Sequence, residues 1–181
     1  MKGFFDSDFK EIFSSQVISL IGGIIAGVML AVFTENLLLI PGILILLPGF
    51  LELRGNISGS MSARLTSGLF LGIVNPKSVK TKIVSGNIIA SFALAVIVCL
   101  VLGTVAFIVN LLVFNAFTPN ILFIPLVAGI IANAVEIPLA LFFTFYLFRK
   151  GHDPNNVMGP FLTSTGDVLS VLALLFAVVV F

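Results

Sequence analysis

Small and polar residues recur on one face of the apolar segment 157–181 and of the turn before it. They follow helical spacings of three and four, and they are Asn156, Gly159, Thr163, Gly166, Asp167 and Ser170. At about 1.5 Å per helical residue, Asp167 lies roughly 20 Å from both Pro154 and Phe181, so we place it near the bilayer midplane. Placing an ionised carboxylate at the midplane costs several kcal/mol. The first, third, fourth and fifth predicted spans hold no lysine or arginine at that depth that could pair with it. Asp167 therefore indicates a cation pathway, unless it is protonated and hydrogen-bonded.

A second stripe begins in segment 37–53 and continues beyond it. Its members are Gly42, Gly49, Glu52, Asn56, Gly59, Ser60 and Ala63. We expect Pro41, Pro48 and Gly55 to interrupt this helix, and carbonyls freed at membrane depth persist only against protein or a water-filled cavity. We interpret Glu52 and Arg54 as interfacial residues near the inner mouth.

A third stripe lies in segment 121–148 and comprises Gly129, Ala132, Asn133, Glu136 and Ala140. Glu136 either lines the same pathway, pairs with Arg149, or forms a hydrogen bond across helices. In segment 12–33 a stripe of small residues that includes a G-x-x-x-G pair predicts close helix packing; its members are Ser19, Gly22, Gly23, Ala26 and Gly27.

The stripes offer carboxylate, amide, hydroxyl and carbonyl oxygens. Cys99 is the only cysteine and His152 the only histidine, and His152 falls in a predicted loop. Sites built only from oxygen suit Mg²⁺, Ca²⁺ or Mn²⁺ rather than zinc or copper. Mg²⁺ keeps most of its waters and is held through one or two carboxylates, which one Asp167 from each of two facing chains would supply.

The amino-acid composition indicates that these segments lie in a membrane. Of 181 residues, 59% are hydrophobic and only 9% are charged, and the mean hydropathy is +1.25. A soluble domain carries about 25% charged residues. We predict an all-α membrane protein of five transmembrane helices at 12–33, 37–53, 83–114, 121–148 and 157–181, with a solvent-side loop and short interfacial helix at 64–82.

Basic residues lie on one side of this arrangement. They are Lys2, Lys10, Arg64, Lys77, Lys80, Lys82, Arg149 and Lys150, whereas the opposite loops hold none. The positive-inside rule therefore predicts a cytoplasmic N-terminus and an outside C-terminus. We take the plasma membrane as the default location, since no targeting signal is present, and expect no nucleic-acid partner.

Enzyme activity is not expected. A rhomboid-like protease needs a serine in a G-x-S-G setting facing a histidine, and Ser58-Gly59 and His152 do not provide this arrangement. A lipid phosphotransferase needs clustered carboxylates to bind a metal and a diphosphate, and no two carboxylates stand close within one predicted span.

Two motifs resemble the membrane domain of the MgtE magnesium transporters, most closely the eukaryotic solute-carrier branch. One is residues 48–57 (Pro-Gly-Phe-Leu-Glu-Leu-Arg-Gly-Asn-Ile) continuing to 62–66 (Ser-Ala-Arg-Leu-Thr). The other is residues 153–160, beginning Asp-Pro, continuing to 163–167, which ends in Gly-Asp. The family's glutamine after Gly-Asn is missing, and Ser58 precedes Gly59, so no role tied to that glutamine is transferred.

The resemblance implies a dimer-axis pore in which Asp167 holds largely hydrated Mg²⁺ near Thr163 and Gly159. It also implies that Asn56 and Gly55 shape the pore mouth. The stripes add three more pore-lining residues. The predicted metal-site residues are Asp167, Thr163 and Gly159, and the predicted pore-lining residues are Asn56, Gly55, Asn156, Ser170 and Glu136. We expect residues 1–181 to form one such domain without a separate cytosolic regulatory domain, paired as a homodimer or with a paralogue.

The leading hypothesis is movement of Mg²⁺, or of Mn²⁺ or Ca²⁺, down an electrochemical gradient. A proton- or sodium-coupled transporter of another small solute also fits broken helices with carboxylates at the midplane. A non-transporting assembly subunit is a third alternative. Channel or exchange mechanism, ion selectivity, flux direction and gating stay open at this point.

Overall fold

The computed structural model describes residues 7–181. These residues form helices joined by turns and short loops, without a strand. The elements are α1 (Ser7–Val32), α2 (Thr34–Leu37), α3 (Ile43–Phe70), α4 (Lys82–Phe114), the 3₁₀ turn η1 (Pro119–Leu122), α5 (Ile124–Arg149) and α6 (Pro154–Val180). The predicted all-α class is confirmed.

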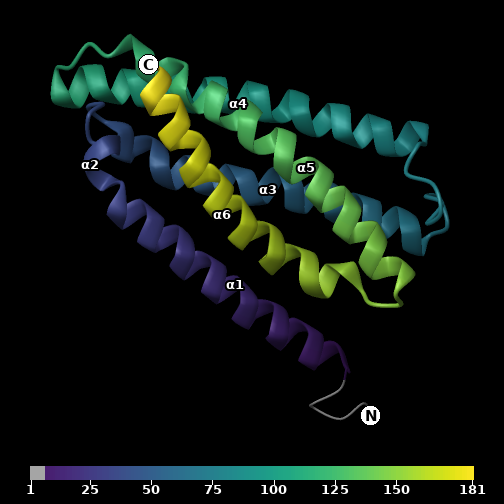
Figure 1. Ribbon diagram of the computed structural model, residues 1–181. Coiled ribbons are helices and arrows are strands. Elements are labelled where there is room, and N and C mark those ends of the chain that lie inside the picture. Colours follow the sequence, from purple (N-terminus) through teal and green to yellow (C-terminus); the bar gives the residue numbers. More distant parts are fainter. Residues whose placement is uncertain (1–6) are drawn as a thin grey trace.

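Five long helices run in alternating directions, so the beginning of α1 and the C-terminus lie at opposite ends of the bundle (Figure 1). Helix α3 packs on α4, α5 and α6, whereas α1 packs mainly on α6 at the edge. The central place of α3 brings its polar face beside that of α6.

Four helices are long and apolar enough to cross a membrane, namely α1, α4, the α5 segment with η1, and α6. Helix α3 has the length, 28 residues, but its sequence includes Glu52, Arg54 and Arg64. Its buried residues pack against neighbouring helices, so its polar side chains are partly shielded by protein. The chain is therefore a multi-pass membrane protein.

Helix α3 differs from the sequence prediction. It runs without a break through Pro48 and Gly55, although a proline inside a helix removes one backbone hydrogen bond. It also continues through Arg64 to Phe70, so the interfacial helix predicted within 64–82 is wrong. Gly72, in the left-handed region at φ +71, ends the helix, and residues 71–81 form turns.

The close packing predicted for α1 is confirmed at Gly22 but does not involve the G-x-x-x-G pair of Gly23 and Gly27 within this chain. No atom of another helix lies within 4 Å of a Cβ placed at Gly23 or Gly27. Gly22 makes the close approach instead, because a Cβ there would lie 2.6 Å from Cβ of Ser164 on α6. The helix packing therefore uses the neighbouring face of α1.

The core consists of two apolar clusters, one towards each end of the bundle. On α3, for example, one cluster ends at Phe50 and the other begins at Met61. Between them lies a layer of buried polar residues, which includes Arg54, Ser58, Asn133, Glu136 and Ser170. Buried polar groups are costly in a membrane unless other groups satisfy them, and in this layer Arg54 and Glu136 form an ion pair with each other.

Candidate functional site

A cleft of about 490 Å³ lies between α3 and α6. Its lining residues are Pro48, Leu51, Glu52, Gly55 and Asn56 from α3 and Gly159, Thr163 and Asp167 from α6. The structure thus brings together five predicted site residues: Asp167, Thr163, Gly159, Asn56 and Gly55. Although distant in sequence, they share one space because α3 packs directly on α6.

The α6 wall presents oxygen atoms along one helical face. Asp153 caps the helix by accepting a hydrogen bond from the backbone N–H of Asn155 at 2.9 Å, and Pro154 follows as the first helical residue. Thr163 donates its hydroxyl to the carbonyl of Gly159 at 3.1 Å, so its lone pairs stay available. Asp167 is half-buried, one turn further along.

The α3 wall contributes Glu52, a cleft residue that our sequence interpretation missed. Asn56 donates from Nδ2 to Oε1 of Glu52 at 3.1 Å, and both side chains are exposed. Glu52 had been interpreted as interfacial, yet it belongs to the same helical stripe as Asn56. That stripe was the signal that could have identified it.

Gly55 lies where the two walls of the cleft meet. A Cβ at this position would lie 3.6 Å from Oγ1 of Thr163, which is ordinary van der Waals contact. A side chain larger than a methyl group would extend into the space between the helices. The role of Gly55 in shaping a pore mouth stays a prediction.

The two carboxylates of the cleft have no ion-pair partner among the residues that the structure describes. Among residues 7–181, neither Glu52 nor Asp167 forms an ion pair with lysine, arginine or histidine. Both line the same cleft. If both groups are ionised, the cleft concentrates two negative charges, which a hard cation would neutralise.

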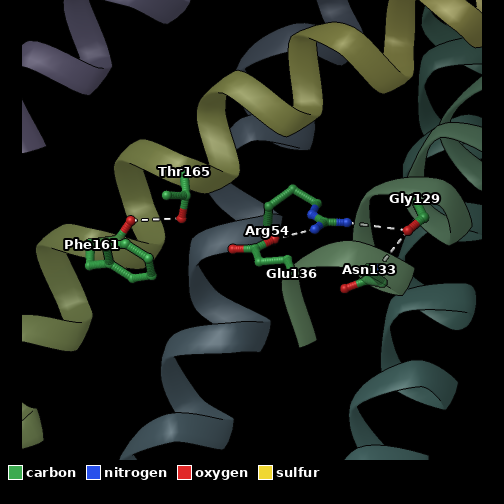
Figure 2. A network of polar contacts seen from close by, with 6 residues as sticks. All are labelled: Arg54, Gly129, Asn133, Glu136, Phe161 and Thr165. Atoms are coloured by element: carbon green, nitrogen blue, oxygen red, sulfur yellow. Dashed lines mark hydrogen bonds and ion pairs between the residues drawn. The ribbon is translucent and has the colours of Figure 1, made fainter. Parts of the chain in front are cut away.

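Glu136 has a different environment from the cleft carboxylates. It forms an ion pair with Arg54, and both side chains are 0% exposed. Arg54 also donates from Nη1 to the carbonyl of Gly129 at 3.2 Å, which Asn133 binds as well at 2.8 Å (Figure 2). The interfacial interpretation of Arg54 is therefore wrong, and Glu136 pairs across helices with Arg54 rather than with Arg149.

Two other predicted residues also lie away from the cleft lining. Asn156 donates from Nδ2 to Oε2 of Glu11 on α1 at 3.3 Å, and its carbonyl accepts from the hydroxyl of Ser15 at 3.0 Å. Ser170 is fully buried in the polar layer. Helical spacing placed both on the stripe, but α1 contacts Asn156 and Ser170 is enclosed by the bundle.

The cleft of one chain does not form a complete set of protein ligands for a cation. Within residues 7–181, no group of three or more His, Cys, Asp or Glu side chains is placed to hold a metal ion. Glu52 and Asp167 of a single chain would need water molecules or a facing surface to complete the coordination. Such incomplete protein coordination suits Mg²⁺, which usually retains several waters.

Comparison with known families connects these observations. The family model described as MgtE, divalent cation transporter, matches residues 47–177, which is more than half of the chain. The matched region includes every residue that lines the α3–α6 cleft. No curated protein and no solved structure gives a significant match.

Proposed function

Because the chain belongs to the MgtE family of divalent cation transporters, we propose that the α3–α6 cleft is its share of the ion pathway and that the ion is Mg²⁺. The observation that carries this proposal is the pair of carboxylates, Glu52 and Asp167, which share the cleft and form no ion pair with a cationic side chain of residues 7–181. A mobile cation supplies the missing charge.

The donor set favours a hydrated hard cation. The polar side chains of the cleft offer carboxylate, amide and hydroxyl groups, without thiol or imidazole. Mg²⁺ loses its waters reluctantly, and the volume of about 490 Å³ leaves space for a water shell. Mn²⁺ and Ca²⁺ share the preference for oxygen ligands, so they are the competitors to compare.

A second copy of the chain closes the cleft in this proposal. Glu52, Asn56 and Thr163 are exposed on the surface of one protomer, where lipid tails could not satisfy them. Two protomers facing each other through α3 and α6 place their clefts on a common axis and bring four carboxylates around it. A paralogue with a similar face would form the same arrangement.

This arrangement makes α3 the fifth membrane-crossing helix. Its polar face then lines the pathway while its other faces contact α4, α5 and α6. The distribution of basic residues supports a cytoplasmic N-terminus. At an inside-negative plasma membrane, a divalent ion gains about 4.6 kcal/mol for each 100 mV, at about 2.3 per charge, which suffices to drive entry.

The test is Mg²⁺ entry into proteoliposomes that contain a fluorescent indicator, under an imposed inside-negative potential. We expect the native chain to conduct and Asp167→Asn to lose flux while remaining a folded dimer. Asp153→Asn is the matched control, because it makes the same change on α6 outside the cleft and asparagine also caps helices. We expect it to retain flux.

Other outcomes would replace the proposal. Retained flux in Asp167→Asn would remove Asp167 from the pathway. Solute flux driven by a pH or sodium gradient without divalent ions would favour a coupled transporter. A folded native dimer without flux of any cation would favour an assembly subunit. Comparison of Mg²⁺, Mn²⁺ and Ca²⁺ entry would establish the selectivity.

A further inference from the structure

A second groove, of about 530 Å³, lies between α3 and α4, near the end of α3 and the beginning of α4. Its lining includes Arg64 of α3 and Lys82, Gly86, Asn87, Ala90 and Leu94 of α4. Two of its lining residues are basic and none is acidic. The groove is separate from the α3–α6 cleft and shares no lining residue with it.

Arg64 is held in place by neutral groups. Its Nε donates to Oδ1 of Asn87 at 2.8 Å, and its Nη1 contacts Oγ of Ser60 at 3.4 Å. The side chain is exposed, and within residues 7–181 it forms no ion pair. Its charge is therefore not neutralised by any carboxylate of residues 7–181.

The depth of Arg64 in the membrane makes the lack of an anionic partner within residues 7–181 important. Asn87 lies five residues after Lys82, or about 7.5 Å along α4, so Arg64 is beside the apolar length of α4 rather than beyond its end. Arginine within a membrane segment is costly unless it reaches an anion, water or a carbonyl. At this depth the phosphates of the bilayer surface are within reach of a long side chain.

The deeper part of the groove is apolar. Ala90 and Leu94 follow Lys82 by eight and twelve residues, or about 12 and 18 Å along the helix. Gly86 leaves the groove open, because no atom of another element lies within 4 Å of a Cβ placed there. The groove therefore has cations at one end and an apolar wall along its length.

We propose that this groove binds an anionic phospholipid, with its phosphate on Arg64 and Lys82 and one acyl chain along Ala90 and Leu94. Charge complementarity selects an anionic headgroup, and the apolar wall selects a lipid over a free anion. Basic pockets between membrane helices on the cytoplasmic side bind such headgroups, and the predicted orientation places this groove on that side.

The test compares purified protein in nanodiscs of phosphatidylcholine with protein in nanodiscs that also contain phosphatidylglycerol with the same acyl chains. Thermal unfolding is the readout, because a ligand that binds only the folded state raises Tm. We expect phosphatidylglycerol to raise the Tm of the native chain and Arg64→Gln to lose most of that rise. Lys77→Gln removes the same charge from the adjacent loop outside the groove and should keep the native response.

Further arms of the experiment distinguish the alternatives. An undiminished lipid response in Arg64→Gln, or an equal loss in Lys77→Gln, would overturn the proposal. Inorganic phosphate giving the same rise in phosphatidylcholine would indicate a simple anion site instead. Conversion of Arg64→Gln to a monomer in phosphatidylcholine would show that a second copy occupies the groove. If Arg64→Gln does not fold, Lys82→Gln must lose the response for the proposal to stand.

Discussion

Glu136 on α5 and Asp167 on α6 are carboxylates on adjacent packed helices, yet their surroundings differ completely. Glu136 is fully buried and paired with Arg54. Asp167 is half-buried, faces an open cleft and shares it with the negative charge of Glu52. The comparison teaches that membrane depth alone does not separate a structural carboxylate from a candidate site residue. Within residues 7–181, Glu136 forms an ion pair and Asp167 forms none.

Two consecutive residues of α6 face these two environments. A Cβ placed at Gly166 would lie 2.8 Å from Oε1 of Glu136, whereas Asp167 lines the cleft. Arg54 similarly lies between Leu53 and Gly55 on α3, and Gly55 lines the cleft from the other wall. The buried ion pair thus lies against both helices that form the cleft, on the side away from its opening.

The largest expected effect comes from removing the cation of the buried pair. Arg54→Met leaves Glu136 buried without a partner, which costs about 3–5 kcal/mol of folding free energy. We expect a large fall in Tm in detergent. Asp167→Asn should leave Tm nearly unchanged, because its carboxylate has no cation in the protein to lose.

A double variant separates charge from packing at this site. Arg54→Met with Glu136→Leu removes both charges, and replacing a buried ion pair with apolar residues is often neutral or stabilising. We expect the double variant to regain most of the Tm lost in Arg54→Met. A double variant as unstable as the single one would show that packing, rather than an unpaired charge, causes the loss.

The sequence predicted the helical class and the main cleft residues because both depend on local patterns. Apolar length indicates membrane helices, and helical spacing places Asp167, Thr163 and Gly159 on one face. The motif resemblance to MgtE is confirmed by the match to that family's model over residues 47–177.

The partners across helices could not be predicted in the same way. The Arg54–Glu136 pair joins residues 82 positions apart, and no local pattern indicates which distant side chain will neutralise a charge. The course of α3 was also misjudged, because tertiary packing on three helices outweighs the helix-breaking tendency of Pro48 and Gly55. Glu52 was assigned to the interface for a related reason, since its helix was expected to end near that point.

A smaller effect is expected at the contact between the two environments. Gly166→Ala places a methyl group against the buried carboxylate of Glu136, where overpacking typically costs about 1–3 kcal/mol. We expect a moderate fall in Tm, smaller than that of Arg54→Met. The Tm loss caused by Gly166→Ala should be smaller in the Arg54→Met, Glu136→Leu double variant. The carboxylate oxygens that the methyl group would crowd are absent there. Additive losses would contradict a direct contact between the two sites.

The second carboxylate of the cleft should affect transport more than stability. Glu52→Gln keeps the size of the side chain and its contact with Asn56 but removes one of the two negative charges. We expect the Mg²⁺ concentration for half-maximal flux to rise several-fold, with Tm unchanged. Glu35→Gln makes the same change at an exposed position on α2, outside the cleft, and should leave flux unaltered. Unchanged concentration dependence in Glu52→Gln would limit the ion site to Asp167.

A slight gain in stability is expected at Gly159, where the cleft is open. Alanine is favoured over glycine inside a helix by about 0.5–1 kcal/mol, and no atom of another element lies within 4 Å of a Cβ there. Gly159→Ala should therefore raise Tm slightly while its methyl group narrows the cleft beside Thr163 and slows flux. Gly23→Ala on α1 has the same free space outside the cleft, so it should raise Tm without slowing flux. Equal flux in the two variants would mean that the ion does not pass close to Gly159. A lower Tm in Gly159→Ala alone would show that another chain already packs against this wall of the cleft.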